Sequence, residues 1–250
     1  MQTEQTAFLL HRRPYRENQF LVDLLTQDEG KVGAVVYVSH SGKSNKKALL
    51  QPFLPLSVQY KGRNALKQLS TVEAIGSSYH YQGTILYSAL YLNEISQRLL
   101  PELVPCSTLF QHYQDSLHLL LQLQKDASSL QNIDQAQLEL ALRQYELVLL
   151  EELGLAFDFD ALHSSDEDYF YFTLEHGFIG VETYSDAMLY QATPVAKGKP
   201  YYRKDLLLAI AQGSYNYTEV MACFKQLMRV CLNELLGGQE LHSRKLFKSY

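Results

Sequence analysis

The sequence predicts an α+β protein with a small N-terminal barrel of five strands, a helical middle region, and a C-terminal region that combines a β-hairpin with helices. Three patterns predict it. Short apolar runs fill residues 1–80, apolar residues recur every three to four positions over residues 81–155, and residues 156–250 carry an alternating stretch before further helical spacing. The 250 residues are 46% hydrophobic, which is ample for packed cores. We therefore expect three domains with these boundaries.

Five short runs in the first 80 residues are typical of strands. Each is partly β-branched or aromatic, and they end at turn residues such as Asp28-Glu29-Gly30 and Lys61-Gly62-Arg63. The runs are AFLL, FLVDLL, VGAVVYV, LPLSVQY and LKQLSTVEA. Five strands in so short a segment suit a small closed barrel of the OB type better than a sandwich of two sheets. The basic loop at residues 39–47 then joins the third strand to the fourth.

Residues 83–155 have the spacing of three packed helices. The most regular stretch is QAQLELALRQYELVLLEELG, in which a single apolar stripe repeats. The stripe consists of Leu138, Leu142, Tyr145, Leu149 and Leu153. Gly154 follows it, and we expect Gly154 to cap the helix because glycine readily adopts the left-handed conformation found at helix ends.

The C-terminal region begins with the alternating stretch EDYFYFTLEHGFIGVE, which His176-Gly177 splits into a predicted hairpin. Helices are expected at about residues 203–212, 217–236 and 242–248. Cys223 and Cys231 then share one helix about 12 Å apart, beyond disulfide reach. With Cys106 they make an odd number of scattered cysteines, which indicates core thiols in a reducing compartment.

Charge is distributed unevenly along the chain. The net charge is −5, but residues 1–80 carry +4, residues 81–196 carry −14 and residues 197–250 carry +5. Such asymmetry indicates separate modules with separate partners. No apolar run approaches the roughly 20 residues that span a bilayer, and the N-terminus lacks the order of a signal peptide. We expect a cytoplasmic protein without membrane partners.

The tripeptide Gly42-Lys43-Ser44 raises the possibility of a phosphate-binding loop. The pattern GxxxxGK[ST] requires a glycine at position 37, which is Tyr37 here, so nucleotide binding is disfavoured. The sequence has no HExxH, CxxC, GxSxG or GxGxxG motif. The acidic run at residues 165–168 lacks the glycine and glutamate of a calcium loop. We predict no metal, no cofactor and no catalytic residue.

Basic residues of the predicted barrel give the stronger functional signal. One lysine alone serves solubility, but ten basic residues at strand ends and turns of one domain favour a groove that follows the backbone of single-stranded nucleic acid. The predicted DNA-binding residues are Arg12, Arg13, Arg16, Lys31, Lys43, Lys46, Lys47, Lys61, Arg63 and Lys67. Aromatic residues that offer stacking faces are Tyr15, Phe20, Tyr37, Phe53 and Tyr60, of which we expect one or two to do so.

A second predicted site concerns basic residues outside the barrel. Arg143 lies in the most regular helix, where it either pairs with Glu139 or Glu146 or clamps a carboxylate of a partner peptide. Both alternatives stay open from the sequence. The residues predicted to bind a partner peptide are Arg143, Arg244, Lys245 and Lys248.

Five segments in this order resemble the bacterial RecO family of recombination mediators over nearly the whole chain. They are AFLLHRRPYRENQFLVDLLTQDEGKV, ALLQPFLPLSVQYKGR, TILYSALYLNEI, ALRQYELVLLEELG and LGGQELHSRKLF. The resemblance implies an N-terminal OB-fold, a helical middle and no catalytic chemistry. It also implies a nucleoid-associated protein that binds single- and double-stranded DNA and anneals complementary strands.

The same resemblance implies protein partners. Members of the family act with RecR to load RecA onto DNA coated by the single-stranded-DNA-binding protein, and they dock the acidic, hydrophobic C-terminal tail of that coating protein. Some relatives carry a zinc module of four cysteines after the helices, but this sequence has no cysteine there. The leading hypothesis is a non-enzymatic annealer and mediator. The alternative is an enzyme that binds a nucleotide or small molecule at Gly42-Lys43-Ser44.

Overall fold

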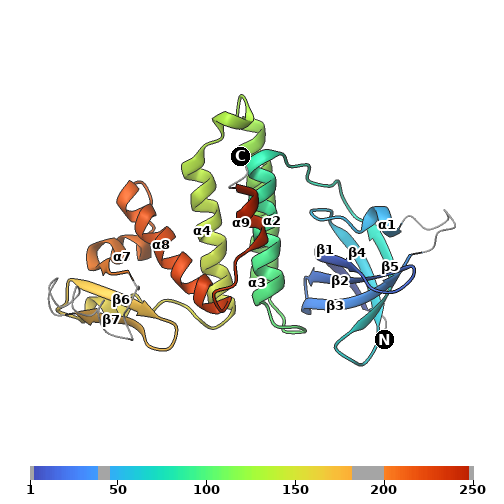
Figure 1. Ribbon diagram of the computed structural model, residues 1–250, viewed down its shortest axis with the longest axis horizontal. Helices are drawn as coiled ribbons and strands as arrows, with labels where there is room; N and C mark the ends of the chain where they lie inside the picture. Colours follow the sequence, from blue (N-terminus) through green and yellow to red (C-terminus); the bar gives the residue numbers. More distant parts are fainter. Residues whose placement is uncertain (1–2, 39–45, 182–199, 248–250) are drawn as a thin grey trace. The chain divides into compact units, whose positions relative to one another are not determined.

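The structure is a computed structural model that describes residues 3–38, 46–181 and 200–247. The chain divides into two compact units (Figure 1). The first consists of Met1–Tyr145 together with Leu241–Tyr250, and the second consists of Glu146–Glu240. These boundaries differ from the three predicted segments, because the barrel shares a unit with the helices that follow it and the last residues of the chain return to that same unit.

The first unit begins with a closed barrel in the strand order β1-β2-β3-β5-β4. Its strands are β1 (Thr3–Pro14), β2 (Gln19–Thr26), β3 (Gly30–Tyr37), β4 (Leu56–Lys61) and β5 (Lys67–Ala74). All neighbours pair antiparallel except β3 and β5, which are parallel. The prediction of a five-stranded OB barrel is confirmed. Alternate residues fill its interior, among them Leu9, Val22, Val36, Val58 and Leu69.

A one-turn helix that the sequence did not predict, α1 (Lys46–Leu49), lies between β3 and β4. Leu50, directly after it, is fully buried in the barrel core. Most of the predicted basic loop, including the Gly42-Lys43-Ser44 tripeptide, lies outside the described residues.

Helices α2 (Gly83–Leu99), α3 (Ser107–Asp126) and α4 (Gln135–Glu152) confirm the three predicted helices. A short 3-10 helix, η1 (Leu130–Asn132), precedes α4. Gly154 ends α4 as expected: its φ is +74°, and the Leu155 amide donates to the Leu150 carbonyl at 2.8 Å.

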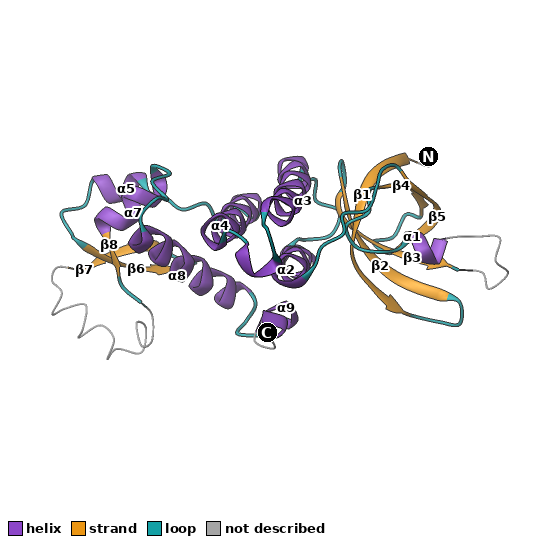
Figure 2. Ribbon diagram, turned by 90° about the horizontal axis from the view of Figure 1, so that it is seen from above, coloured by secondary structure: helices purple, strands orange, loops and turns teal. Residues whose placement is uncertain are grey.

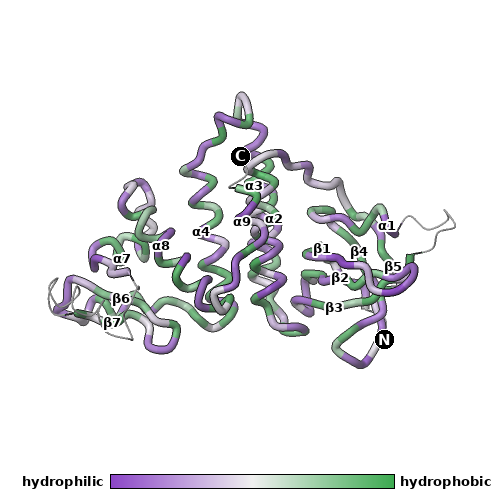
Figure 3. Tube along the Cα trace, viewed as in Figure 1, coloured by the Kyte–Doolittle hydropathy of each residue, from purple (hydrophilic) through white to green (hydrophobic). Residues whose placement is uncertain are grey.

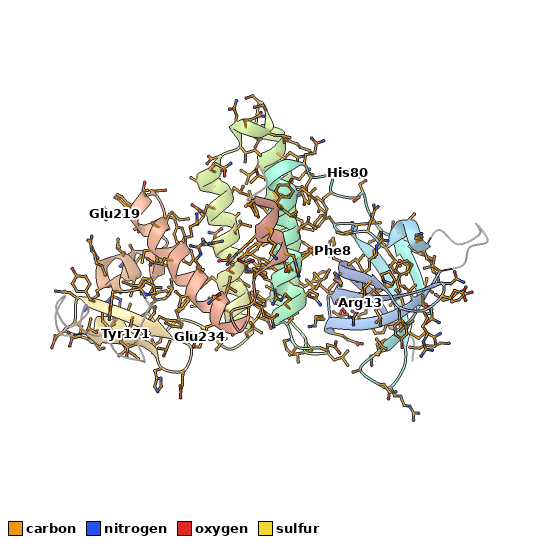
Figure 4. All side chains as sticks on the ribbon, viewed as in Figure 1. Phe8, Arg13, His80, Tyr171, Glu219 and Glu234 are labelled. Atoms are coloured by element: carbon orange, nitrogen blue, oxygen red, sulfur yellow. The ribbon has the colours of Figure 1, made fainter. Side chains whose placement is uncertain are left out.

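The barrel packs against α2 and α3 through a β-bulge in β1. The register of β1 with β2 shifts between Leu9 and His11, and the Asn93 side chain donates to the carbonyls of Leu9 and Leu10. Phe8, labelled in Figure 4, places its ring against Phe110 and Tyr113 of α3. A buried side-chain hydrogen bond and an aromatic cluster therefore join barrel and helices into one unit.

The last helix, α9 (His242–Phe247), lies along α2 (Figure 1). The Glu94 carboxylate of α2 accepts hydrogen bonds from the backbone amides of His242 and Ser243, each at 2.8 Å, and from Ser243 Oγ at 2.7 Å. Phe247 packs edge-on against Tyr87 at 5.7 Å. These contacts explain why residues 241–250 group with the first unit and not with the segment that precedes them.

The second unit holds a three-stranded sheet in the order β7-β6-β8 and helices packed on it (Figure 2). Its elements are α5 (Asp160–His163), β6 (Tyr169–Thr173), β7 (Gly177–Val181), β8 (Tyr202–Arg203), α7 (Lys204–Ala211) and α8 (Thr218–Leu235). The predicted hairpin and C-terminal helices are confirmed. The sequence did not predict β8, because two residues are too few to show an alternating pattern. Cys223 and Cys231 are buried in α8 and are not joined in a disulfide.

Candidate nucleic-acid interface

One row of residues crosses the outer face of the whole barrel. Arg13 in β1 lies opposite Leu21 in β2, Leu21 opposite Val35 in β3, Val35 opposite Gln68 in β5, and Gln68 opposite Lys61 in β4. The two cations and Gln68 are exposed, and the two aliphatic residues are half-buried. The row therefore has a positive charge at each end and apolar surface between. We call these five residues the cross-strand row.

Two exposed tyrosines stand beside this row. Tyr37 follows Val35 by two positions, so its side chain points to the same face of β3, and it is 57% exposed. Tyr15 lies in the turn after β1 and is 45% exposed. The central carbon of the Arg16 guanidinium lies over the Tyr15 ring, 5.1 Å from its centroid. The Tyr15 amide donates to the Gln19 carbonyl, and Gln19 pairs with Tyr37. Both rings thus belong to one end of the barrel, where the turn that joins β1 to β2 is hydrophilic (Figure 3).

The opposite half of the same face is partly covered, although His11 in it is exposed. The next row consists of His11, Asp23 and Gly33. Gln97 of α2 donates to the Asp23 carboxylate at 2.9 Å, and a Cβ on Gly33 would stand 3.4 Å from the Glu102 carboxylate. The carboxylates of Asp23 and Glu102 therefore border the cross-strand row on this side, and their negative charge is unfavourable for a phosphate.

Lys31 belongs to this partly covered half. Its ammonium donates to the Gln97 carbonyl at 2.9 Å, and its own carbonyl accepts from the Leu103 amide at 2.8 Å. The structure thus places Lys31 at the junction of barrel and helices and does not bring it to Arg13 or Lys61. The sequence offered no signal for this difference, because all predicted cations follow strand ends or turns in the same way.

The remaining predicted cations form two groups. Arg12, Arg13 and Arg16 lie at the end of β1, where Arg12 hydrogen-bonds the carbonyl of Lys47 at 3.2 Å and so joins this group to α1. The second group lies at the β4–β5 turn and consists of Lys61, Arg63 and Lys67. Lys67 donates to the Gly62 carbonyl across that turn at 3.2 Å. Lys43 lies outside the described residues.

Of the five aromatic candidates, only Tyr15 and Tyr37 are exposed. Phe53 and Tyr60 are each 5% exposed, and Phe20 is half-buried beneath the Arg12 guanidinium at 5.9 Å. Burial also raises the pKa of Tyr60, with the Glu29 carboxylate adding to the effect. Sequence reasoning missed Leu21, Val35 and Gln68, although their alternation with the core residues Val22, Val36 and Leu69 marks them as outward-facing.

The residues predicted to bind a partner peptide lie on two helices. Arg143 in α4 is only 8% exposed. Arg244 in α9 is half-buried and stacks over the Tyr91 ring at 5.8 Å, while Lys245 is exposed. Lys248 lies outside the described residues. Beside this pair, burial raises the pKa of the Glu94 carboxyl, but hydrogen bonds from Ser243 and His242 outweigh it and hold the pKa below its usual value.

Within the described ranges, no group of three or more His, Cys, Asp or Glu side chains is arranged to hold a metal ion. Among those same residues, no helix has both the length and the apolar character needed to cross a membrane.

The fold and the cross-strand row define an OB-fold protein with a basic, aromatic surface. A family model described as "Recombination protein O N terminal" matches residues 1–78. Over nearly its full length the chain is also similar to three proteins named "DNA repair protein RecO". The relative from Pseudoalteromonas atlantica is 37% identical over 99% of this chain and 95% of its own. Those from Hahella chejuensis and Cellvibrio japonicus are 35% and 37% identical, over 98% and 97% of this chain and 95% of their own. The chain belongs to the RecO family.

Proposed function

We propose that this protein acts in DNA repair and recombination by binding single-stranded DNA on its barrel and annealing complementary strands. The observation that carries the proposal is the cross-strand row, in which Arg13 and Lys61 flank the half-buried Leu21 and Val35. Similarity to proteins named "DNA repair protein RecO" supports a role in DNA repair.

The row favours an unpaired strand over a duplex. Neighbouring strands lie about 4.8 Å apart, so a path across five of them is roughly 19 Å long and takes only a few nucleotides. Exposed tyrosine rings bind bases by stacking, which requires that the bases be unstacked from a partner strand. Tyr15 supplies such a ring at the Arg13 end of the row, and Tyr37 supplies another beside Val35 in the middle of the row. Arg16, which lies over the Tyr15 ring, adds a cation for the phosphate backbone of the DNA strand.

Annealing then follows from charge neutralisation alone. Two strands repel each other through their phosphates, and a surface that neutralises one strand while leaving base edges accessible lowers that barrier. No nucleotide hydrolysis or metal ion is needed for this step. We propose that the protein has no enzymatic activity.

We further propose that the protein works with RecR to load RecA onto DNA coated by the single-stranded-DNA-binding protein. It would reach coated DNA by docking the acidic tail of the coating protein, with Arg143, Arg244 and Lys245 as the candidate cations. Such an attachment raises the local concentration of the annealer on the coated strand. The last turn of α9 supports this, because it carries the half-buried Arg244 and the exposed Lys245.

The test of DNA binding is a salt titration with a labelled single-stranded oligonucleotide. Arg13→Ala and Lys61→Ala should each weaken binding and reduce the salt slope by about 0.7, the value for one phosphate contact on a single strand. Lys125→Ala is the matched control, since Lys125 is an exposed lysine on α3 outside the barrel. If all three variants keep the wild-type slope, the barrel row is not the DNA site.

The test of annealing is a fluorescence assay with chelator present and nucleotide absent. Complementary strands coated with the full-length coating protein should anneal faster than strands coated with a version lacking its acidic tail. Equal rates on the two substrates, or a requirement for ATP, would contradict the mechanism.

A further inference from the structure

Arg12 and Arg13 are neighbours in β1, yet their side chains point to opposite faces of the strand. Arg13 lies opposite Leu21 on the outer face, whereas Arg12 lies opposite Val22, whose side chain fills the barrel core. Arg12 therefore emerges at the end of the barrel and not in the cross-strand row. A role that differs from that of Arg13 follows from this alternation.

We propose that Arg12 is a positioning residue, which fixes the end of α1 and thereby holds Lys47 at the DNA-binding surface. This inference rests on the proposed DNA-binding function. It assigns to Lys47 the phosphate contact and to Arg12 the task of placing it.

The hydrogen bonds around α1 carry the proposal. The last carbonyls of a helix have no partner within the helix and must be satisfied from elsewhere. Backbone amides serve two of them here: the Leu50 amide donates to the Lys46 carbonyl and the Gln51 amide to the Leu49 carbonyl. Arg12 Nη1 serves two others, donating to the carbonyls of Leu50 at 2.6 Å and of Lys47 at 3.2 Å. Arg12 thus acts as a C-terminal cap supplied by a distant strand.

The guanidinium is held in place from its other side. Its central carbon lies 5.9 Å from the centroid of the Phe20 ring, and Phe20 itself packs against the barrel core. A cation over an aromatic face gains about 0.5–1 kcal/mol at exposed sites. With two carbonyls and one ring as partners, Arg12 has a fixed position, whereas a cation that follows a mobile phosphate backbone has no need of one.

Lys46 provides a second attachment of α1 to the barrel. Lys46 Nζ donates to the Ser70 carbonyl of β5 at 2.6 Å, so α1 is tied to β1 by Arg12 and to β5 by Lys46. Leu50 adds a fully buried anchor. Arg12 and Lys46, both predicted from the sequence as phosphate contacts, therefore bind main-chain oxygens around α1. Lys47, between these tethers, is exposed.

A double-mutant cycle on single-stranded DNA affinity tests the proposal. We expect Lys47→Ala to weaken binding about fivefold near 0.1 M salt, the effect of one phosphate contact. If Arg12 acts by placing Lys47, then Arg12→Ala has a similar effect and the double variant is no weaker than either single variant. Multiplication of the two effects to about 25-fold would show instead that Arg12 contacts DNA independently.

Hydrogen exchange without DNA provides the second measurement. In Arg12→Ala the amides of Leu50 and Gln51 should exchange faster than in the wild type, while those of the β4–β5 hairpin stay unchanged. Unchanged exchange at α1 would overturn the positioning role. Arg13→Ala is the control, because it removes a neighbouring charge without touching α1. If Arg13→Ala and Lys47→Ala both keep wild-type DNA affinity while Arg12→Ala still loosens α1, the proposed DNA site fails and only the structural tether stands.

Discussion

The Asn93 side-chain amide donates to the carbonyl oxygen of Leu10 at 3.3 Å, and the two residues belong to different layers of the first unit. Leu10 is the residue skipped by the register of β1 with β2, so its carbonyl lies at the irregular part of the ladder. Asn93 also accepts a hydrogen bond from the Tyr113 hydroxyl at 2.5 Å. A single buried amide thus connects the barrel, α2 and α3.

Replacing this amide should be costly. We expect Asn93→Ala to lower the free energy of unfolding by about 2–4 kcal/mol, because each buried polar group left without a partner costs about 1–3 kcal/mol. Urea unfolding measures the loss. Asn132→Ala is the control: this exposed side chain bonds Ser128 on the surface, and its removal should change the free energy of unfolding by no more than about 0.5 kcal/mol. Equal losses would mean that the bulge carbonyls find other partners.

Gly30 and Gly177 offer a matched pair of glycines. Both have positive φ, +69° and +68°. A Cβ on Gly30 would lie 1.8 Å from the Val104 carbonyl oxygen, whereas a Cβ on Gly177 meets nothing within 4 Å. Gly177→Ala should cost about 1–2 kcal/mol for the left-handed backbone alone. Gly30→Ala should cost a further 1–3 kcal/mol, roughly, for the clash. Thermal unfolding of the two variants measures these losses of stability. Equal losses would contradict the close approach of Gly30 to the Val104 carbonyl.

The docking of α9 on α2 should weaken in acid. Burial raises the pKa of Glu94, but the hydrogen bonds from α9 outweigh it and hold the pKa below its usual value of 4.5. A lowered carboxyl pKa in the folded state contributes stability that is present above the unfolded value and is lost as pH falls through the folded value. Protection of the Ser243 amide against hydrogen exchange, corrected for the intrinsic rate, should therefore fall below pH 4.5. In the Glu94→Gln variant the protection of the Ser243 amide should be low at every pH. If this variant still lost protection as the pH fell, a group other than Glu94 would be responsible for the pH dependence.

Tyrosine and arginine variants should separate stacking from charge. Tyr37→Ala should weaken single-stranded DNA binding by about 1–3 kcal/mol with an unchanged salt slope, because stacking releases no counterions. Arg13→Ala should change the slope. Tyr217→Ala is the control, since Tyr217 is 68% exposed at the start of α8 in the other unit. A reduced slope in Tyr37→Ala would show that the ring acts by placing a cation.

The partner-peptide site can be tested by calorimetry with a peptide that has acidic residues and an apolar C-terminus. Arg244→Glu should weaken binding about tenfold or more, in line with about 1.5–3 kcal/mol for a hydrogen bond to a charged group. Because Arg143 is buried, Arg143→Met is the appropriate variant, as it keeps the volume without burying a carboxylate. Unchanged affinity in Arg143→Met would remove that residue from the site, and Lys125→Glu controls for net charge.

The sequence predicted the elements well because their periods are regular. Apolar residues alternate along the five strands in residues 3–74, and in the three helices they recur every three to four residues. Each of these elements buries one face, and the apolar pattern marks that face in the sequence. α1 and β8 were missed, since four and two residues are too few to show a period. The cations were predicted as one class, whereas the structure divides them by partner. Arg12, Lys31 and Lys46 bind backbone carbonyls of segments far away in the sequence, and no local pattern encodes such contacts.

The hydrogen bonds between Glu94 and Ser243 affect the order in which the chain folds during synthesis. The two residues are 149 positions apart, and the whole second unit is encoded between them. At a ribosomal rate of about 5–20 residues per second, roughly 7–30 s pass between the emergence of Glu94 and that of its partner. During that interval the nascent barrel and its helices must persist with the α9 surface of α2 open. The first unit is therefore the first to start folding and the last to finish.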